Sequence, residues 1–158
     1  MFVLVRAVTY STLFIGFLLV FLPERLLGWS GAVRPAVIGS AQAAGMAVAA
    51  SGAALALWCI ATFVYVGKGT PAPFDPPRQF VARGPYRYVR NPMYLGAAIA
   101  MAGAALFFQS GALAGYAAGF LAVTHAFVLG YEEPTLRATF GAEYDRYCET
   151  VRRWWPKP

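Results

Sequence analysis

The stretch GPYRYVRNPMYLG, residues Gly84–Gly96, stands directly in front of a long apolar segment. It holds two arginines, three tyrosines and two prolines, a density of cationic and aromatic groups that an ordinary membrane loop does not need. Within it, Asn91-Pro92 is typical of a helix start, with asparagine as the N-cap residue and proline at the first helical position. The stretch therefore predicts where a basic, aromatic loop ends and an apolar helix begins.

The composition of the chain is that of a membrane protein. Of 158 residues, 59% are hydrophobic and only 13% are charged, which lies outside the range of soluble proteins. The net charge is +6, but the basic residues flank apolar segments, so we expect anionic lipid headgroups as partners and no nucleic acid. Two cysteines make no disulfide framework, and a single histidine excludes a histidine-cluster metal site, so no metal is expected. The length predicts one domain over residues 1–158.

Four segments are apolar enough to cross a bilayer, whose core needs about 20 apolar residues as a helix. They are residues 3–22, 36–66, 93–109 and 111–131. The first ends at Leu22-Pro23 without a signal-peptide cleavage site, so we interpret it as a retained span. The link between the last two is so short that it forces an antiparallel hairpin. The sequence predicts an all-α integral membrane protein with four transmembrane helices.

The basic residues orient these spans. The 67–92 loop and the segment after residue 131 carry ten of the thirteen lysines and arginines, whereas the 23–35 loop has only Arg25 and Arg34. Positively charged loops face the cytoplasm. We therefore expect a cytoplasmic 67–92 loop, cytoplasmic N- and C-termini, and a location in the inner or cytoplasmic membrane.

The C-terminal segment 135–151 has the pattern of one amphipathic helix. Its apolar stripe consists of Leu136, Phe140, Tyr144, Tyr147 and Val151. We expect this helix to lie at the membrane surface and close over the loop, with Trp154 and Trp155 as interfacial anchors.

Small residues recur every fourth position on the hairpin. The two stripes are Gly96, Ala100 and Ala104, and Gly111, Gly115 and Gly119. Such stripes let helix backbones approach closely, so both predict tight helix packing.

Two polar clusters bracket the hairpin, which should bring them together. One ends the loop at Arg90–Tyr94, and the other is Glu132-Glu133-Pro134. A helix N-terminus with arginines suits a carboxylate, aromatic faces suit a sulfonium, and carboxylates suit hydroxyl and amino groups. This set of groups fits S-adenosylmethionine. The alternative is a basic interfacial loop that Glu132 and Glu133 neutralise as ion pairs.

The C-terminal half carries four motifs in a fixed order. They are Gly84-Pro85-Tyr86, Arg90-Asn91-Pro92-Met93-Tyr94-Leu95-Gly96, Glu132-Glu133-Pro134-Thr135-Leu136 and Phe140-Gly141-Ala142-Glu143-Tyr144-Asp145-Arg146-Tyr147. Their order and spacing over residues 67–158 resemble those of the isoprenylcysteine carboxyl methyltransferases and the related phospholipid methyltransferases of membranes. The resemblance implies a membrane enzyme that transfers a methyl group from S-adenosylmethionine.

The resemblance and the charge pattern together give a set of cofactor-binding candidates. They are Arg78, Gln79, Phe80, Val81, Tyr86, Arg90, Asn91, Pro92, Met93, Tyr94, Glu132 and Glu133. The alternative for the tyrosines is a place in the interfacial aromatic belt, and for Glu132 a helix-capping charge.

Two positions depart from the family pattern. Asn91 stands where the pattern has a histidine, and because asparagine cannot titrate, any role there is hydrogen bonding. Val128 stands where the prenylcysteine enzymes resemble one another in having an arginine, which removes the obvious partner of a carboxylate substrate.

His125 is the candidate catalytic residue. On a continuous helix it shares a face with Val128 and Glu132. An ionisable residue inside a span is a functional candidate, and a neutral imidazole can accept a proton from an amine or thiol. The alternative is a histidine bonded to a backbone carbonyl of a neighbouring helix.

The expected function is methyl transfer to a lipophilic acceptor at the cytoplasmic membrane face. The acceptor is an isoprenylcysteine carboxylate, a phospholipid amine or a small thiol. The alternative is a non-catalytic membrane subunit or small-molecule binding protein with the same architecture.

Overall fold

The computed structural model describes residues 2–32, 34–67 and 80–157, and most of them are helical. In chain order the elements are α1 (Phe2–Ile15), η1 (Gly16–Phe21), α2 (Leu22–Ser30), α3 (Ser40–Thr62), η2 (Phe63–Gly67), η3 (Gly84–Arg87), α4 (Pro92–Phe108), α5 (Gly111–Phe127), η4 (Val128–Glu132), α6 (Glu133–Phe140) and α7 (Ala142–Thr150). Within this described part, the only strand-like pairing is an isolated bridge between Val89 and Arg152. The prediction of an all-α chain is confirmed.

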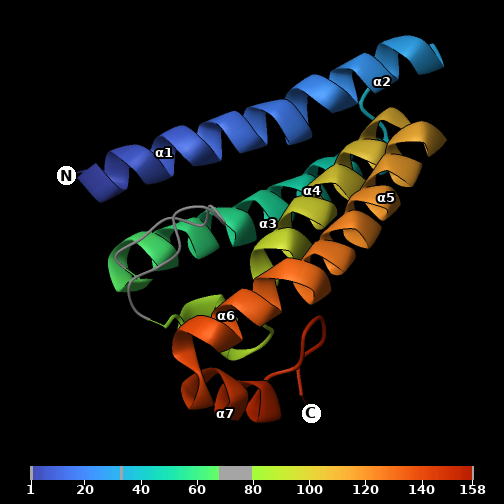
Figure 1. The fold of residues 1–158 in the computed structure, drawn as a ribbon. Helices are drawn as coiled ribbons and strands as arrows, with labels where there is room; N and C mark the ends of the chain where they lie inside the picture. The colour runs from blue at the N-terminus through green and yellow to red at the C-terminus, as the bar shows by residue number, and fades with distance from the viewer. Residues whose placement is uncertain (1, 33, 68–79, 158) are drawn as a thin grey trace.

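Three helical runs of the described part are long and apolar enough to cross a membrane. They are Thr12–Ser30, Ser40–Gly67 and Gly111–Phe140. The remaining predicted span, residues 93–109, corresponds to α4, which is apolar but has only 17 residues. Figure 1 shows α3, α4 and α5 packed side by side, with α1 and α2 crossing over them. These runs are consistent with an integral membrane protein.

The first helix does not end at Pro23, as the sequence analysis expected, but continues through it to Ser30. The reason is the π-helical turn η1, in which the N–H of Leu22 donates to the carbonyl of Phe17, five residues earlier. Proline has no N–H, and a widened turn accommodates it without breaking the helix. The carbonyl of Leu18 then accepts a hydrogen bond of 2.9 Å from the hydroxyl of Tyr116 on α5.

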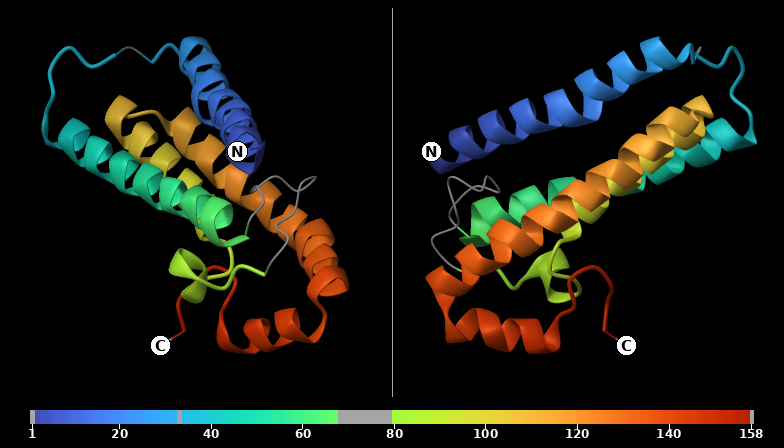
Figure 2. Two further views of the ribbon diagram at one scale, coloured as in Figure 1. Left: turned by 90° about the vertical axis from the view of Figure 1, so that its left-hand side faces the viewer. Right: turned by 45° about the vertical axis from the view of Figure 1, so that its right-hand side comes forward.

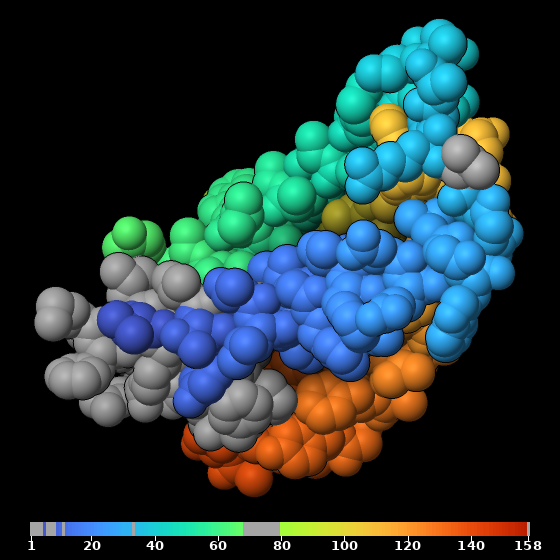
Figure 3. Space-filling view, turned by 90° about the horizontal axis from the view of Figure 1, so that it is seen from above, coloured from blue at the N-terminus to red at the C-terminus, as the bar shows by residue number. Residues whose placement is uncertain are grey.

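This contact helps to hold the first helical layer, which consists of α1, η1 and α2, on the bundle of α3, α4 and α5. Leu18 and Leu19 pack against a buried cluster formed by α4 and α5, whose members are Ala98, Met101, Ala117 and Phe120. Figure 2 shows this layer from two further sides, and Figure 3 shows α1 and α2 (blue) lying between α3 (green) and α5 (orange).

Glycines set the close contact between α3 and α4. A Cβ atom added at Gly45 would lie 2.6 Å from the backbone nitrogen of Phe107, and one at Gly96 would lie 2.8 Å from the carbonyl oxygen of Gly52. Real side chains do not tolerate such approaches, so only glycine lets these two backbones touch. The predicted packing role of Gly96 is confirmed.

The glycine stripe on α5 behaves differently. At Gly111, Gly115 and Gly119 an added Cβ atom would meet no atom of the described residues within 4 Å. The prediction that this stripe packs against another helix is wrong within this chain, because the tight interface of α4 is made with α3 and not with α5.

The α4–α5 connection is the predicted antiparallel hairpin. Gln109 ends α4 in the left-handed conformation, with φ of 50°. The hydroxyl oxygen of Ser110 then accepts a hydrogen bond from the N–H of Leu113 and so caps α5.

The last long helix runs without a break from α5 through η4 into α6. Thr124, Val128 and Glu133 follow one buried line along it, with exposed fractions of 7%, 1% and 8%. The last step is five residues, because in η4 the N–H of Glu133 donates to the carbonyl of Val128. Pro134 follows directly and has no N–H to donate, the same arrangement as at Pro23.

This widened turn corrects the predicted face of His125. The sequence analysis placed His125, Val128 and Glu132 on one face of a regular helix. In the structure Val128 is buried, whereas His125 is exposed, and the turn η4 moves Glu133 onto the buried line in place of Glu132.

The predicted single helix over 135–151 is also wrong. The chain forms α6 and α7 instead, broken at Gly141, whose φ of 51° and ψ of −127° favour glycine. Arg137 and Asp145 form an exposed ion pair of 2.8 Å across the break. The break folds α7 back beneath the bundle (Figure 1).

Candidate functional site

The two predicted polar clusters meet through side-chain contacts, of which the first joins Tyr94 to Glu132. The hydroxyl of Tyr94 donates a hydrogen bond of 3.0 Å to Oε2 of Glu132. Tyr94 lies on the first turn of α4, and Glu132 ends η4, 38 residues later in the chain. The hairpin therefore brings both motifs to one end of the bundle, as the sequence predicted.

The loop in front of α4 is anchored on α3. Gly84 has φ of +58°, and an added Cβ atom would lie 2.9 Å from the hydroxyl oxygen of Thr62. Gly84 is the first residue of the short turn η3, and Pro85 is the second. A glycine is required at position 84 both for the backbone conformation and for the close approach.

Three of the candidate residues belong to an apolar cluster under this loop. Val81 and Tyr86 are buried with Cys59, and Met93 packs against them. The ring of Phe63 meets that of Tyr86 edge-on, with centroids 5.2 Å apart. Burial raises the pKa of Tyr86 well above its ordinary value, so its phenol stays neutral.

The aromatic ring of Phe80 joins the loop to the C-terminal helices. Its centroid lies 5.3 Å from that of Phe140, 5.9 Å from that of Tyr144 and 5.0 Å from that of Tyr147. The hydroxyl of Tyr147 donates a hydrogen bond of 2.5 Å to the carbonyl of Tyr86. These contacts confirm that the C-terminal segment closes over the loop.

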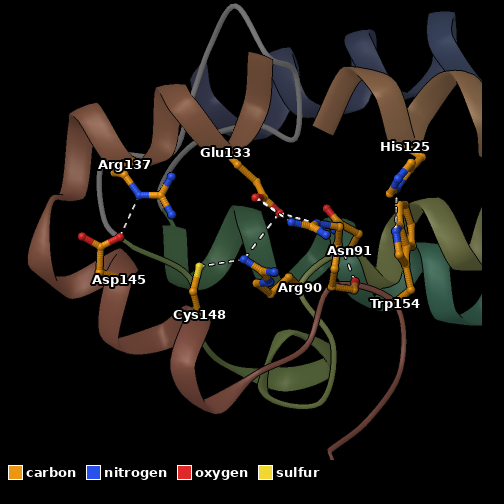
Figure 4. A network of polar contacts seen from close by, with 9 residues as sticks. Arg90, Asn91, His125, Glu133, Arg137, Asp145, Cys148 and Trp154 are labelled. Atoms are coloured by element: carbon orange, nitrogen blue, oxygen red, sulfur yellow. Dashed lines mark hydrogen bonds and ion pairs between the residues drawn. The ribbon is translucent and has the colours of Figure 1, made fainter. Parts of the chain in front are cut away.

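A partly buried ion-pair network surrounds Glu133, the residue that follows Glu132 in the chain (Figure 4). Nε and Nη2 of Arg153 donate to Oε1 and Oε2 of Glu133, over 2.6 and 3.0 Å. Nη1 of Arg90 lies 3.4 Å from Oε1 of Glu133 and donates a hydrogen bond of 2.7 Å to the sulfur of Cys148. The hydrogen bond to Glu133 raises the pKa of Arg153 above its ordinary value.

Asn91 occupies the predicted N-cap position, and Pro92 is the first residue of α4, but the side chain of Asn91 does not cap the helix. Its amide nitrogen Nδ2 instead donates a hydrogen bond of 3.3 Å to the carbonyl of Arg153. The capping role is therefore corrected: Asn91 ties the start of α4 to the C-terminal segment.

His125 lies apart from the ion pairs and contacts the same C-terminal segment. The indole N–H of Trp154 donates a hydrogen bond of 3.0 Å to Nδ1 of His125. Figure 4 shows this contact, in which the two ring planes are tilted by 45° with centroids 5.9 Å apart. Trp154 and Trp155 were both expected as interfacial anchors. The indole N–H of Trp154 is bonded to His125, whereas Trp155 is 73% exposed.

The structure brings most of the candidate residues together at one end of the bundle. Val81, Tyr86 and Met93 form the apolar part, and Tyr94 and Glu132 form the central contact. Arg90 and Glu133 belong to the ion-pair network, and Asn91 is bonded to the backbone of Arg153. Arg78 and Gln79 lie outside the described residues.

Sequence reasoning missed Arg153, Tyr147 and Cys148 as members of this site. The tail had been interpreted as a basic surface segment, and its two adjacent arginines look alike in the sequence. Only the structure shows that Glu133 is buried, and a buried carboxylate needs cations beside it.

A protein-family model matches the part of the chain that carries most of this site. The model described as phospholipid methyltransferase matches residues 40–143, more than half of the chain. The chain belongs to the phospholipid methyltransferase family. No curated protein and no solved structure matches it.

Membership in the phospholipid methyltransferase family indicates membrane methyltransferase activity. The matched residues include the loop from Phe80, the Tyr94–Glu132 pair and His125, and they end before the segment that carries Arg153. In the described part of the chain, no three His, Cys, Asp or Glu side chains are placed to hold a metal ion.

Proposed function

We propose that this protein transfers a methyl group from S-adenosylmethionine to a lipophilic acceptor at the cytoplasmic membrane face. The observation that carries the proposal is the 3.0 Å hydrogen bond between Tyr94 and Glu132, because it joins the two motifs on which the family resemblance rests. The cytoplasmic placement rests on the basic residues gathered in the 67–92 loop and the tail.

The residues present fit the proposed cofactor. Glu132 is the carboxylate for its amino or hydroxyl groups, and the hydrogen bond from Tyr94 uses only one of its two oxygens. Nε of Arg90 is buried, and among the described residues it has no hydrogen-bond partner. A buried donor without an acceptor calls for a ligand or solvent atom, and the cofactor's carboxylate suits it.

The ion pairs indicate different roles for the two adjacent glutamates, Glu132 and Glu133. Glu133 has both oxygens engaged by Arg153 and a second cation, Arg90, beside it. We therefore assign Glu132 to cofactor binding and Glu133 to organising the loop and the tail, which refines the original candidate set.

The bound cofactor supplies an already activated methyl group on its sulfonium. What remains for the chain is to orient the acceptor in line with that group and to exclude water. The apolar cluster of Val81, Tyr86 and Met93, next to the membrane-spanning bundle, suits a hydrophobic acceptor.

The acceptor chemistry depends on two positions of α5 and η4. Val128 is a buried, uncharged residue, with 1% of its surface exposed. It stands where the prenylcysteine enzymes share an arginine, so it offers no positive charge to a carboxylate acceptor. A phospholipid amine or a thiol fits better, with His125 taking the proton of an amine. Because Trp154 donates to Nδ1 of His125, that atom accepts the proton only after Trp154 moves away.

Calorimetry with S-adenosylmethionine and the full-length protein in lipid nanodiscs tests the proposal, together with transfer of a radiolabelled methyl group into a membrane lipid extract. Binding and label transfer are expected. Binding without transfer would support the alternative of a non-catalytic binding protein, and the absence of both would refute the proposal.

A further inference from the structure

The segment that follows α7 runs along the loop in front of α4. The N–H of Arg90 donates a hydrogen bond of 2.9 Å to the carbonyl of Arg152, and the N–H of Asn91 donates one of 3.3 Å to the carbonyl of Arg153. With the side-chain amide of Asn91, the carbonyl of Arg153 accepts from two donors of one residue. The backbone of Arg153 thus fixes the residue that directly precedes α4.

The side chain of Arg153 reaches the opposite wall of the site. Its guanidinium group holds both carboxylate oxygens of Glu133 in a bidentate pair, with side chains only 29% and 11% exposed. Such a fork fixes orientation as well as distance, which a single point charge does not. Glu133 directly follows Glu132 in the chain.

Arg153 therefore contacts Asn91 and Glu133, which lie close in the chain to Tyr94 and Glu132, the two residues of the central contact. Asn91 lies three residues, about one helical turn, before Tyr94, and Glu133 is adjacent to Glu132. We propose that Arg153 is a positioning residue, which sets the spacing of the Tyr94–Glu132 pair for the cofactor; this inference rests on the proposed function. It touches no reacting group itself.

The effect on binding follows from geometry. A hydrogen bond weakens steeply when its length or angle departs from the preferred values, and the loss of one hydrogen bond to a charged group corresponds to a rise in Kd of about tenfold or more. In Arg153→Ala, Glu133 keeps only the longer contact to Arg90. The backbone carbonyl of residue 153 remains as the acceptor of both Asn91 donors, but no side chain ties it to Glu133 any longer. The two walls of the site would then be joined by the Arg90–Glu133 contact and by the Tyr94–Glu132 bond that the cofactor itself must share.

The test compares S-adenosylmethionine affinities of full-length variants by calorimetry in nanodiscs. Arg153→Ala is expected to raise Kd by about tenfold or more, and Arg153→Lys, which keeps the charge but loses the fork, by less. Arg152→Ala is the matched control, since it changes the adjacent arginine, whose side chain is exposed, and keeps its backbone contacts. Its Kd should stay within about twofold of the wild type.

A double-variant cycle separates positioning from general stability. If Arg153 acts through the Tyr94–Glu132 pair, Arg153→Ala costs much less affinity in a Tyr94→Phe background than in the wild type. Equal factors in both backgrounds, or an unchanged Kd in Arg153→Ala, would overturn the inference. Should Arg153→Ala not fold, Arg153→Lys carries the same cycle. A wild-type protein that does not bind the cofactor refutes the proposed function instead, and the inference with it.

Discussion

Glu133 follows Val128 by five residues on the buried line of the last long helix, and the N–H of Glu133 donates to the carbonyl of Val128. A regular α-helix would place Glu132 at that position, since its hydrogen bonds span four residues. The widened turn decides which glutamate faces the arginines and which faces Tyr94. The one extra residue in this turn therefore gives Glu132 and Glu133, two adjacent and chemically identical side chains, different partners.

Pro134→Ala tests this assignment. Alanine restores a backbone donor and favours a regular helix, so we expect the turn η4 to tighten and the Glu133–Arg153 pair to weaken. Cofactor affinity measured by calorimetry should fall although alanine is the better helix former. Pro23→Ala makes the same change in the first helix, away from the site, and should leave the affinity unaltered. Wild-type affinity in Pro134→Ala would show that the widened turn is unimportant for binding.

Glu132→Gln should weaken S-adenosylmethionine binding more than any other single change at the site. Hydrogen bonds to charged groups contribute about 1.5–3 kcal/mol, which corresponds to a rise in Kd of about 10- to 150-fold. Tyr94→Phe, which removes only the neutral partner, should cost about 0.5–1.5 kcal/mol. Glu143→Gln changes an exposed carboxylate of α7 and serves as the control in the same calorimetric titration. If Glu132→Gln binds like the wild type, Glu132 does not hold the cofactor.

His125→Ala should abolish methylation of an amine acceptor and spare cofactor binding. A general base contributes a factor of about 100 to 10,000, which is measurable as label transfer into a phospholipid extract. Trp154→Phe keeps an aromatic ring but lacks the N–H that occupies Nδ1 of His125, so its turnover should be retained or raised. A fully active His125→Ala protein would leave the hydrogen bond to Trp154 as the whole role of this histidine.

Gly96→Ala and Gly115→Ala make the same substitution in neighbouring helices with opposite expected results. At Gly96 the new methyl group would lie 2.8 Å from the carbonyl oxygen of Gly52 and force α3 and α4 apart. Thermal unfolding in nanodiscs should show a loss of about 1–3 kcal/mol, the usual cost of overpacking. At Gly115 no atom of the described residues lies within 4 Å, so alanine should be neutral or stabilising by up to about 1 kcal/mol. Comparable losses at both positions would mean that the α5 stripe is covered in the native protein.

Much of the fold could be predicted because it follows from local rules. Apolar length predicted the helices, the short link at Gln109 and Ser110 predicted the hairpin, and Gly96 predicted a close helix contact. Two of the failures share one cause. The first helix was expected to end at Pro23, and the helix that carries His125 and Glu132 was expected to be regular. In both places a π-helical turn precedes a proline and carries the helix through, because neighbouring helices stabilise what an isolated helix would not keep.

Most residues of the candidate site could be predicted from the sequence, but the contacts between them could not. The motifs of the 84–96 stretch and of Glu132-Glu133 identified the family and the end of the bundle where they meet, because residue types and spacing along the chain carry that information. Which glutamate binds Tyr94, which of two arginines enters the site, and that Asn91 and His125 both bond to the tail were decided only by the tertiary structure. Each of these depends on a helix register or a direction of the returning tail, which long-range packing sets and no local pattern encodes.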